Sequence, residues 1–499
     1  LRIRLSILAV AVFAADVYGL NLPDYVTRIP LFSAFPTAAA AVFLLLFIGH
    51  MALIWAWAYP CHRRLSETDQ GRAEYVLSNI SFSVPVLLPW LVLSGVADLI
   101  LALPFALPKR LLSTPQGEVA YFLTFLVLVA VFGPLMIQKF WRCRPLDKGP
   151  VRDRIEQVCQ RAGVRYADIL FWPLFGGRMI TAAVMGLVGR FRYILVTSGL
   201  LQCLAPSEID AVVAHEIGHV KRRHLPFYLF FFVGYILLAY SSFDLIVFLL
   251  IYSDPVYRFV QLTGLNPATV SSALFSIVII SLFLLYFRFI FGYFMRNFER
   301  QADLYAYELF QTAEPLISTF KKIAWFSGQS PDKPNWHHFG IGERIDYLQR
   351  CEADRSWIHR HHRKVRNSIL VYLVGIVLVG AVGVHLNYGE SGRRLSRHFM
   401  ETVVLRELSR SPQNAELYRV LGDIYYGSQR PAEAAEAYKK AVELAPDNAV
   451  ALNNLAWLYA TSEKEHLKNP EKALSLAEKA ASIDPSPHVL DTLAESYYV

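Results

Sequence analysis

Residues 207–224 read SEIDAVVAHEIGHVKRRH, a helical stretch with His215, Glu216 and His219 in the order H-E-I-G-H. Residues four apart lie on the same face of a helix, so the imidazoles of His215 and His219 can bind one metal ion. Glu216 then points at a water molecule on that metal and can act as a catalytic base. The pattern predicts a metal site built for hydrolysis.

A catalytic zinc ion takes three protein ligands and keeps a fourth position open for water. The third ligand is expected in residues 296–305, RNFERQADLY, where Glu299 and Asp303 are again four residues apart. We interpret Glu299 as the zinc ligand and Asp303 as the acceptor of a hydrogen bond from a ligand imidazole. The sequence thus predicts one zinc ion per chain, held by His215, His219 and Glu299.

The composition points to a membrane protein. The chain has 499 residues, of which 54% are hydrophobic and only 18% are charged, and its aromatic content of 14% excludes disorder as the main state. The formal charge is +8, but the basic residues lie between apolar stretches, so we expect no nucleic-acid partner. The five cysteines form no C-x-x-C pair, which argues against a disulfide framework or a thiolate zinc site.

About seven membrane spans are expected, because a span needs roughly 20 mostly apolar residues. Six segments meet this length, and a shorter seventh covers residues 5–20 and is read as a span rather than a signal peptide. The six longer segments are residues 36–59, 84–103, 119–137, 226–252, 269–291 and 369–386. Two of these spans separate His219 from Glu299, an even number, so both residues return to the same side of the membrane.

Lysine and arginine are concentrated in alternate connections between the spans, and basic connections stay in the cytosol. The basic segments 139–223 and 296–364 are therefore expected in the cytosol and the chain after residue 386 on the opposite side. We expect an integral protein of the bacterial inner membrane whose active site faces the cytosol.

The chain after the last span carries an internal repeat. Leu421, Gly422 and Tyr425 recur as Leu455, Ala456 and Tyr459, 34 residues later. This alanine-rich pattern resembles the tetratricopeptide repeat, and two repeats with the first helix of a third are present. The resemblance implies a helical solenoid that binds a protein partner, and a packing module without a ligand stays open as an alternative.

These features predict a mainly α protein with a polytopic helical membrane part and a tetratricopeptide solenoid. The resemblance of the H-E-x-x-H and E-R-Q-A-D segments to those of membrane zinc peptidases implies a zincin-type α+β catalytic domain. The expected order is N-terminal transmembrane helices at 1–137, the first part of the peptidase domain at 138–225, a transmembrane hairpin at 226–291, the second part of the peptidase domain at 292–368, the last span at 369–387, a linker at 388–412 and the repeats at 413–499.

H-E-x-x-H followed by E-R-Q-A-D, flanked by membrane spans, resembles the gluzincin membrane peptidases, which include the HtpX-type bacterial heat-shock membrane protease and the CAAX prenyl endopeptidases. The resemblance covers roughly residues 138–350. Within it, residues 178–186 and 193–204 resemble the strand pair that precedes the active helix in the family, whose edge strand would bind the substrate backbone.

The resemblance also implies roles beyond the metal ligands. His338 would contact the scissile carbonyl oxygen, with its neighbour His337 as the alternative, and Arg344, six residues further on, would support the site. His224 also lies near the motif, and we interpret it as a solvated or interfacial histidine.

The function indicated is a membrane zinc metalloendopeptidase in which Glu216 is the base, and His338 assists. Its partners would be a protein or peptide substrate and the lipid bilayer, the substrate being membrane-associated or misfolded protein. Two alternatives stay open: a CAAX-type protease for lipidated peptides, and a tetratricopeptide membrane scaffold with a non-catalytic metal site.

Overall fold

The computed structural model describes residues 2–66, 71–173, 179–251, 254–264, 266–327 and 336–499. The chain forms two compact units: Leu1–Phe231 with Arg288–Ser368, and Phe232–Phe287 with Ile369–Val499. Most of the described residues are helical and the few strands are short, so the predicted mainly α fold is confirmed.

Long apolar helices identify an integral membrane protein. Among the described residues, five helices are long and apolar enough to cross a membrane, and a pair bent by 57° within α5 makes a sixth. The segment expected as the first of seven spans contains a shorter apolar helix, Ile7–Val17. The long helices are α4 (Pro36–Ser66), α5 (Arg72–Ala102), α7 (Pro115–Phe140), α11 (His224–Ile251), α13 (Pro267–Leu285) continued by η4 (Tyr286–Phe291) and α14 (Gly292–Phe310), and α17 (Ser356–Tyr388).

Shorter helices connect these elements: α1 (Arg2–Ala14) with η1 (Ala15–Gly19), α2 (Leu22–Thr27), α3 (Pro30–Ala34), α6 (Ala106–Leu112) and α12 (Asp254–Thr263). The ionisable side chains near the apolar N-terminal helices have partners. The Nε2 atom of His50 lies 3.1 Å from the Asp16 carboxylate, and Asp98 accepts a hydrogen bond from the Thr37 N–H at 2.7 Å. Pairing of this kind offsets the cost of placing such groups in lipid.

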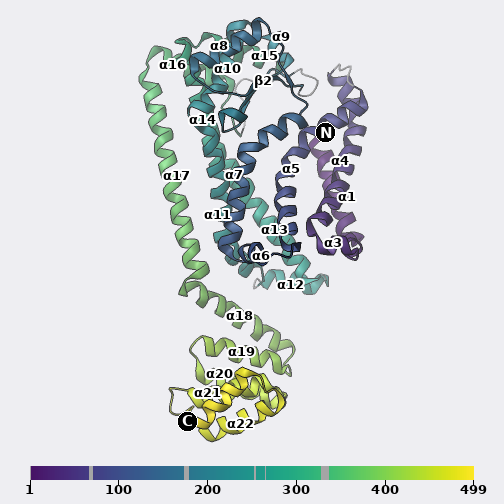
Figure 1. The fold of residues 1–499 in the computed structure, drawn as a ribbon, viewed down its shortest axis with the longest axis vertical. Helices are drawn as coiled ribbons and strands as arrows, with labels where there is room; N and C mark the ends of the chain where they lie inside the picture. The colour runs from purple at the N-terminus through teal and green to yellow at the C-terminus, as the bar shows by residue number, and fades with distance from the viewer. Residues whose placement is uncertain (1, 67–70, 174–178, 252–253, 265, 328–335) are drawn as a thin grey trace. The chain divides into compact units, whose positions relative to one another are not determined.

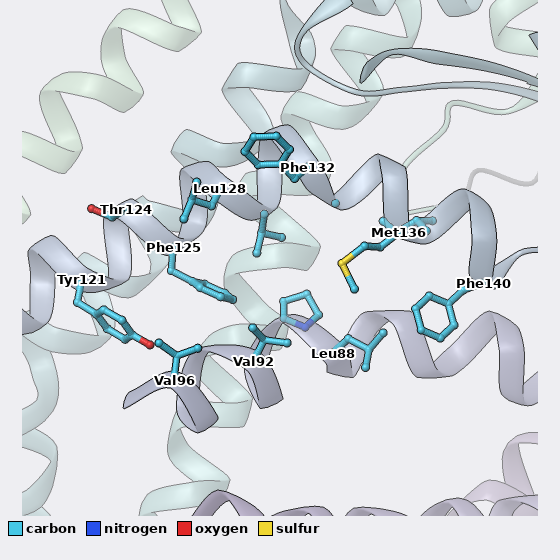
Figure 2. Close-up of a pocket in the computed structure, with 14 residues that line it drawn as sticks. Leu88, Val92, Val96, Tyr121, Thr124, Phe125, Leu128, Phe132, Met136 and Phe140 are labelled. Atoms are coloured by element: carbon cyan, nitrogen blue, oxygen red, sulfur yellow. The ribbon is translucent and has the colours of Figure 1, made fainter. Parts of the chain in front are cut away.

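An apolar pocket of 410 Å³ lies between α5 and α7 (Figure 2). Val92 and Phe125 face each other across it, and Met136 lies nearer its far end (Figure 2). The Tyr121 hydroxyl, on its lining, donates to the Leu93 carbonyl at 2.6 Å, which leaves the surface of the pocket almost wholly hydrocarbon.

A four-stranded sheet belongs to the first unit. Its order is β1 (Arg144–Pro145), β2 (Asp168–Phe171), β4 (Tyr193–Val196), β3 (Ala182–Met185). β2 and β4 are parallel, and the other two pairs are antiparallel, with β3 at an edge. The predicted strand pair is present as β3 and β4, but Arg178 lies outside the described residues.

The strand predicted over residues 193–204 is wrong after Val196. Residues Ser198–Cys203 form helix α9, because the Thr197 side chain accepts a hydrogen bond from the Leu200 N–H and caps a helix at that point. The chain then passes through Leu204 and Ala205 directly into the next helix, which carries the H-E-x-x-H motif.

Five of the described helices pack around the sheet, and Figure 1 shows α8, α10 and α15 gathered near β2. They are α8 (Pro150–Ala162), α10 (Pro206–Lys221), α14 (Gly292–Phe310), α15 (Glu314–Ser327) and α16 (Ile341–Ala353), and the short η3 (Gly189–Phe191) leads into β4. Their shared apolar core includes Ile155, Ile194, Ile217 and Leu304, each fully or almost fully buried. This core fixes α10 against α14 and the sheet.

The second unit contains the repeats. Helices α19 (Ala415–Gly427) and α20 (Pro431–Leu444), then α21 (Ala449–Thr461) and α22 (Pro470–Ile483), form two helix pairs, and α23 (Pro487–Tyr498) begins a third. Figure 1 shows these helices stacked at the C-terminal end of the chain.

The stretch expected to be a linker is instead mostly helix α18 (Glu390–Arg410). Val404 and Leu408, one helical turn apart, are buried against Leu421 and Ile424 of α19. Because this apolar face covers the first repeat, α18 packs as an additional helix of the solenoid.

Candidate metal centre

Helix α10 is anchored at its start. Pro206 occupies the first turn, where its missing N–H costs nothing, and the Glu208 carboxylate accepts a hydrogen bond from the Ala205 N–H at 2.6 Å. Glu208 also receives hydrogen bonds from Ser318 at 2.6 Å and Lys322 at 2.7 Å, both on α15. Ile209, Val213 and Ile217 are buried on its apolar face, so the opposite face presents the motif.

Helix α14 crosses α10 closely at Gly218. A Cβ atom built on Gly218 would lie 2.9 Å from the Cα of Ala302 and 3.1 Å from the Cβ of Tyr305. Any larger residue would push the two backbones apart, because Ala302 itself is fully buried. The small residues at this crossing bring the ligand side chains of the two helices within reach of each other.

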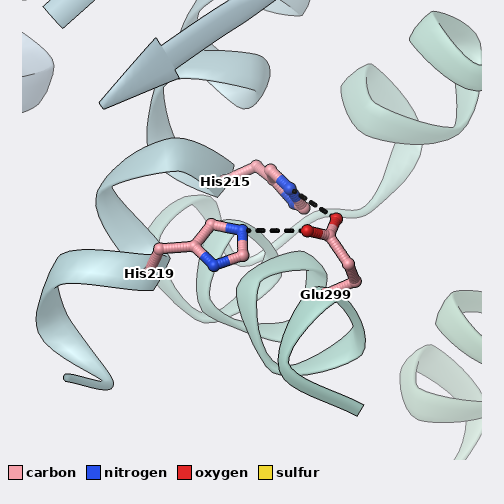
Figure 3. A group of neighbouring side chains, drawn as sticks. All are labelled: His215, His219 and Glu299. Atoms are coloured by element: carbon pink, nitrogen blue, oxygen red, sulfur yellow. Dashed lines mark ion pairs between the residues drawn. The ribbon is translucent and has the colours of Figure 1, made fainter. Parts of the chain in front are cut away.

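His215, His219 and Glu299 converge at this crossing (Figure 3). The figure shows both imidazoles, from one helix, directed toward the carboxylate of Glu299 on the other. The Nε2 atom of His215 lies 3.3 Å from one oxygen of Glu299, and the Nε2 atom of His219 lies 3.4 Å from the other. Their donor atoms all fall within 4.8 Å of one another, so one metal ion fits among them.

Asp303 lies one turn after Glu299 and contacts the other nitrogen of His215. Its Oδ1 atom is 2.8 Å from the Nδ1 atom of His215, and Arg344 reaches both of its oxygens, at 2.6 and 2.8 Å. The Arg344 guanidinium stacks over Phe320. The contacts of Arg344 with Asp303, and of Asp303 with His215, hold the imidazole so that its Nε2 atom faces the metal position.

The site is almost closed to solvent, which changes its acid–base properties. Burial lowers the pKa of His215, but the carboxylates of Asp303 and Glu299 outweigh this effect and raise it to about 10. Burial lowers the pKa of His219 to about 4. Burial raises the pKa of Glu216 to about 7, close to the working value for a proton acceptor at neutral pH.

Glu216 directly follows His215 on α10 and contacts the edge of the sheet. A backbone hydrogen bond links its carboxylate to Val184 on β3, the edge strand. The Glu216 carboxylate is therefore in contact with an edge strand whose geometry could hold an extended peptide.

The segment before α16 brings His338, and not His337, to the ligands. The Nδ1 atom of His338 lies 3.1 Å from the same Glu299 oxygen that faces His215. Two arginines of α14 secure this segment, because Arg296 donates to the Trp336 carbonyl at 2.8 Å and Arg300 stacks on Phe339. His337 packs beside Trp336 and its pKa is lowered by burial to about 4.

The interpretation of His224 as a solvated or interfacial histidine is wrong, because its side chain is fully buried. Arg223 adopts a left-handed conformation, with φ of 58°, that ends α10 and turns His224 back toward the site. Its Nδ1 atom lies 3.1 Å from the Nδ1 atom of His219, and its Nε2 atom lies 3.0 Å from Oε1 of Gln301. The sequence signal was the proximity of His224 to the motif, but the turn at Arg223 was not foreseen.

The site thus combines two imidazoles and a carboxylate around one metal position, an adjacent carboxylate able to take a proton, and a strand edge able to hold a peptide. The donor set contains no sulfur and leaves one position of a tetrahedral metal free, as a catalytic rather than structural zinc site requires.

Comparison with known proteins agrees with this geometry. The model of the family described as Peptidase family M48 matches residues 145–404, just over half of the chain. Two models described as Tetratricopeptide repeat match residues 415–448 and 437–475.

Individual relatives align with shorter parts of the chain. A Protease HtpX homolog of Aeropyrum pernix is 32% identical over 112 residues, which cover 21% of this chain and 34% of that protein. A CAAX prenyl protease 1 homolog of Arabidopsis thaliana is 26% identical over 125 residues, covering 24% and 28%. The chain therefore spans about a third or less of the length of these relatives. A crystal structure of S. mikatae Ste24p is 18% identical, with a TM-score of 0.45, and the match covers 68% of this chain and 86% of that one.

Proposed function

The chain belongs to peptidase family M48, and we propose on this premise that it is an integral-membrane, zinc-dependent endopeptidase. Its substrates in this proposal are membrane-associated or misfolded proteins. The observation that carries the proposal is the convergence of His215, His219 and Glu299, whose donor atoms lie within 4.8 Å of one another beside Glu216.

The residues fit a zinc ion. Two imidazole nitrogens and one carboxylate oxygen are the donor set of a catalytic zinc site with an open position. Both histidines present Nε2 to the same carboxylate, and Asp303 holds the far nitrogen of His215 in the orientation that ligation needs. When bound, zinc would act as a Lewis acid toward water and the scissile carbonyl.

In the proposed mechanism, Glu216 takes a proton from the attacking water and later delivers it to the nitrogen of the leaving amine. Burial raises the pKa of this carboxyl above that of an exposed glutamate, which favours proton acceptance near neutral pH. The partly buried position of the carboxylate limits the access of bulk water that would compete for this proton.

Substrate binding is assigned to the edge of the sheet. A peptide pairing with β3 would extend the sheet and pass beside Glu216, which a hydrogen bond links to Val184. His338, 3.1 Å from Glu299 and partly exposed, is proposed to donate a hydrogen bond to the scissile carbonyl oxygen. Asp303 and Arg344 are proposed as supporting residues that hold the ligand geometry.

For the membrane arrangement we propose a bacterial inner membrane protein whose peptidase domain, residues 138–225 and 292–368, faces the cytosol. The hairpin of residues 226–291 separates its two parts, and the charge asymmetry of the connections supports the orientation. The repeats would then lie on the opposite side, where a protein partner is proposed to bind them.

A CAAX-type activity on lipidated peptides is the second candidate. It is favoured by the similarity to the CAAX prenyl protease 1 homolog and tested by offering prenylated peptides beside an unfolded protein. A scaffold with a structural metal predicts a closed four-ligand site, whereas the described site provides three ligands and a base.

Hydrolysis of casein by the intact chain in detergent tests the proposal. Glu216→Gln should bind zinc normally and lose activity by about 10²–10⁴-fold, the usual contribution of a general base. Glu443→Gln, which alters an exposed carboxylate of α20, is the matched control and should keep full activity. Unchanged casein cleavage by Glu216→Gln would overturn the proposed role of this residue.

A further inference from the structure

His219 differs from His215 in what holds its second nitrogen. His215 faces the Asp303 carboxylate, whereas the Nδ1 atom of His219 faces the imidazole of His224 at 3.1 Å. The Tyr228 hydroxyl also approaches this nitrogen, at 3.5 Å, which is the longer of the two contacts. One ligand therefore has an anionic support and the other a neutral one.

The hydrogen-bond partners of His224 determine which of its two ring nitrogens carries the proton. If His219 binds zinc through Nε2, its proton resides on Nδ1 and must be donated. His224 then accepts on Nδ1 and carries its own proton on Nε2, which lies 3.0 Å from Oε1 of Gln301. A cationic His224 would place two N–H groups head to head, so only the neutral tautomer fits.

The same assignment of donors and acceptors extends beyond His224. The Nε2 atom of Gln301 lies 3.1 Å from Nδ1 of His362 on α17, which leaves the His362 proton on Nε2. That nitrogen is 3.6 Å from a Glu308 oxygen, and Glu308 is paired in turn with Arg222. From His219 through His224 and Gln301 to Nδ1 of His362, each hydrogen bond has one donor and one acceptor under a single assignment of protons.

Packing holds His224 in place independently of these bonds. Its ring is fully buried and stacks on Phe298 of α14, with centroids 4.3 Å apart and planes within 3°. Phe298 precedes Glu299 in sequence, so the same turn of α14 supplies a metal ligand and the surface on which His224 rests.

We propose that His224 is a positioning residue that fixes the tautomer and the ring orientation of His219, and that Gln301 keeps His224 in its accepting form. The inference rests on the proposed zinc site. It assigns His224 no contact with the substrate and no proton transfer during hydrolysis. A neutral support makes His219 a weaker donor than His215, and loss of that support would release the metal more readily.

Zinc affinity of the full chain in detergent, measured by competition with a chelator, tests this proposal. His224→Phe keeps a ring on Phe298 but removes the acceptor, and should weaken zinc binding by about 10–100-fold. His224→Asn offers an amide oxygen near the position of Nδ1 and should restore affinity to within a few-fold. Cobalt substitution should show an altered absorption spectrum for His224→Phe only.

The matched control is His361→Phe. Like His224, His361 is buried, but it lies on α17 and bonds the Asn297 backbone carbonyl at 3.1 Å. In the part of the chain that the structure describes, it has no contact with a ligand histidine. It should lose stability without losing zinc affinity. Gln301→Leu gives a second test should His224→Phe fail to fold, and should weaken zinc binding by a smaller factor.

The outcomes separate this inference from the proposed function. A wild-type chain without zinc would refute the zinc site itself. A wild-type chain with one zinc, together with a His224→Phe variant of equal affinity, would refute only the role of His224. Equal weakening by His224→Phe and His361→Phe would likewise contradict it, since the loss would then reflect stability alone.

Discussion

Helices α10 and α14 cross at Gly218, and helices α19 and α20 of the repeats cross at Gly422. At the first crossing the close approach brings together charged and polar side chains that are almost fully buried. At the second it admits the ring of Tyr438 among buried alanines such as Ala434 and Ala441. A glycine at a helix crossing thus allows close approach in both regions, beside the proposed metal site in one and within the packed repeats in the other.

The two crossings differ in the free energy needed to bury their side chains. Burying Glu299 and Asp303 is unfavourable unless cations and hydrogen-bond donors surround them, and His215 and Arg344 fulfil that need. Burying alanine is favourable without such partners, and Tyr438 needs only one, which its hydroxyl finds in Asp423 at 2.7 Å. The polar crossing is therefore the sensitive one for function, while the apolar crossing is expected to affect only stability.

Among the variants at the two crossings, Gly218→Ala should produce the largest effect. The added methyl group would lie 2.9 Å from the Ala302 backbone, so α10 and α14 must separate and the ligands shift. We expect kcat/KM for casein to fall about 100-fold, as for other misplacements of about 1 Å. In contrast, Gly422→Ala meets only the side chain of Tyr438 and should leave activity within twofold. Similar activity loss in both variants would break the comparison.

Substitutions of two aspartates, one near each crossing, test the same contrast between the polar and the apolar crossing. Asp303→Asn weakens the support of His215 and should lower zinc affinity by about 10–100-fold. Asp423→Asn removes the charge that accepts from the Tyr438 hydroxyl at 2.7 Å and should destabilise the repeats while zinc affinity stays unchanged. Chelator competition and thermal unfolding measure the two effects, and the comparison fails if Asp423→Asn also releases zinc.

Zinc binding should depend on pH. Without a metal, the pKa of His215 is raised to about 10, so this imidazole is protonated below that pH and must lose its proton to bind zinc. Affinity should therefore rise by about tenfold per pH unit from pH 7 toward pH 9. Asp303→Asn should flatten this dependence in part, because one of the two carboxylates that raise the pKa of His215 is gone. A wild-type affinity independent of pH would contradict the pairing of His215 with Asp303.

Tyr438→Phe should produce the smallest effect. It deletes the hydroxyl that bonds Asp423 but keeps the ring beside Gly422, so the repeats should lose about 1 kcal/mol of unfolding free energy. Thermal unfolding of the full chain measures the loss, with casein hydrolysis as the control. Any change in kcat/KM beyond twofold would show that the repeats influence the peptidase site.

Short-range spacing made the central features predictable. A separation of four residues on one helix was sufficient to place His215 and His219 together, and the 34-residue period was sufficient to find the paired helices of the repeats. In both cases the geometry is set by the helix itself, so the sequence carries it directly.

Features that depend on distant contacts were not predictable. His224 is buried because Arg223 adopts a positive φ and Phe298 offers a stacking surface. No local sequence pattern predicts the backbone conformation of Arg223 or the contact with Phe298. Helix α18 was not predicted, because the burial of Val404 and Leu408 depends on their contact with Leu421 and Ile424 of the first repeat. Gln301 was overlooked because its partners, His224 and His362, are far away in sequence.

X-ray absorption at the zinc edge tests the central claim most directly, because it reports the atoms bound to the metal in the intact chain. The account predicts one zinc per chain with only nitrogen and oxygen neighbours at about 2.0–2.2 Å, including two imidazoles, and one imidazole fewer in His219→Ala. A sulfur neighbour at about 2.3 Å, or an imidazole count that His219→Ala leaves unchanged, would contradict it.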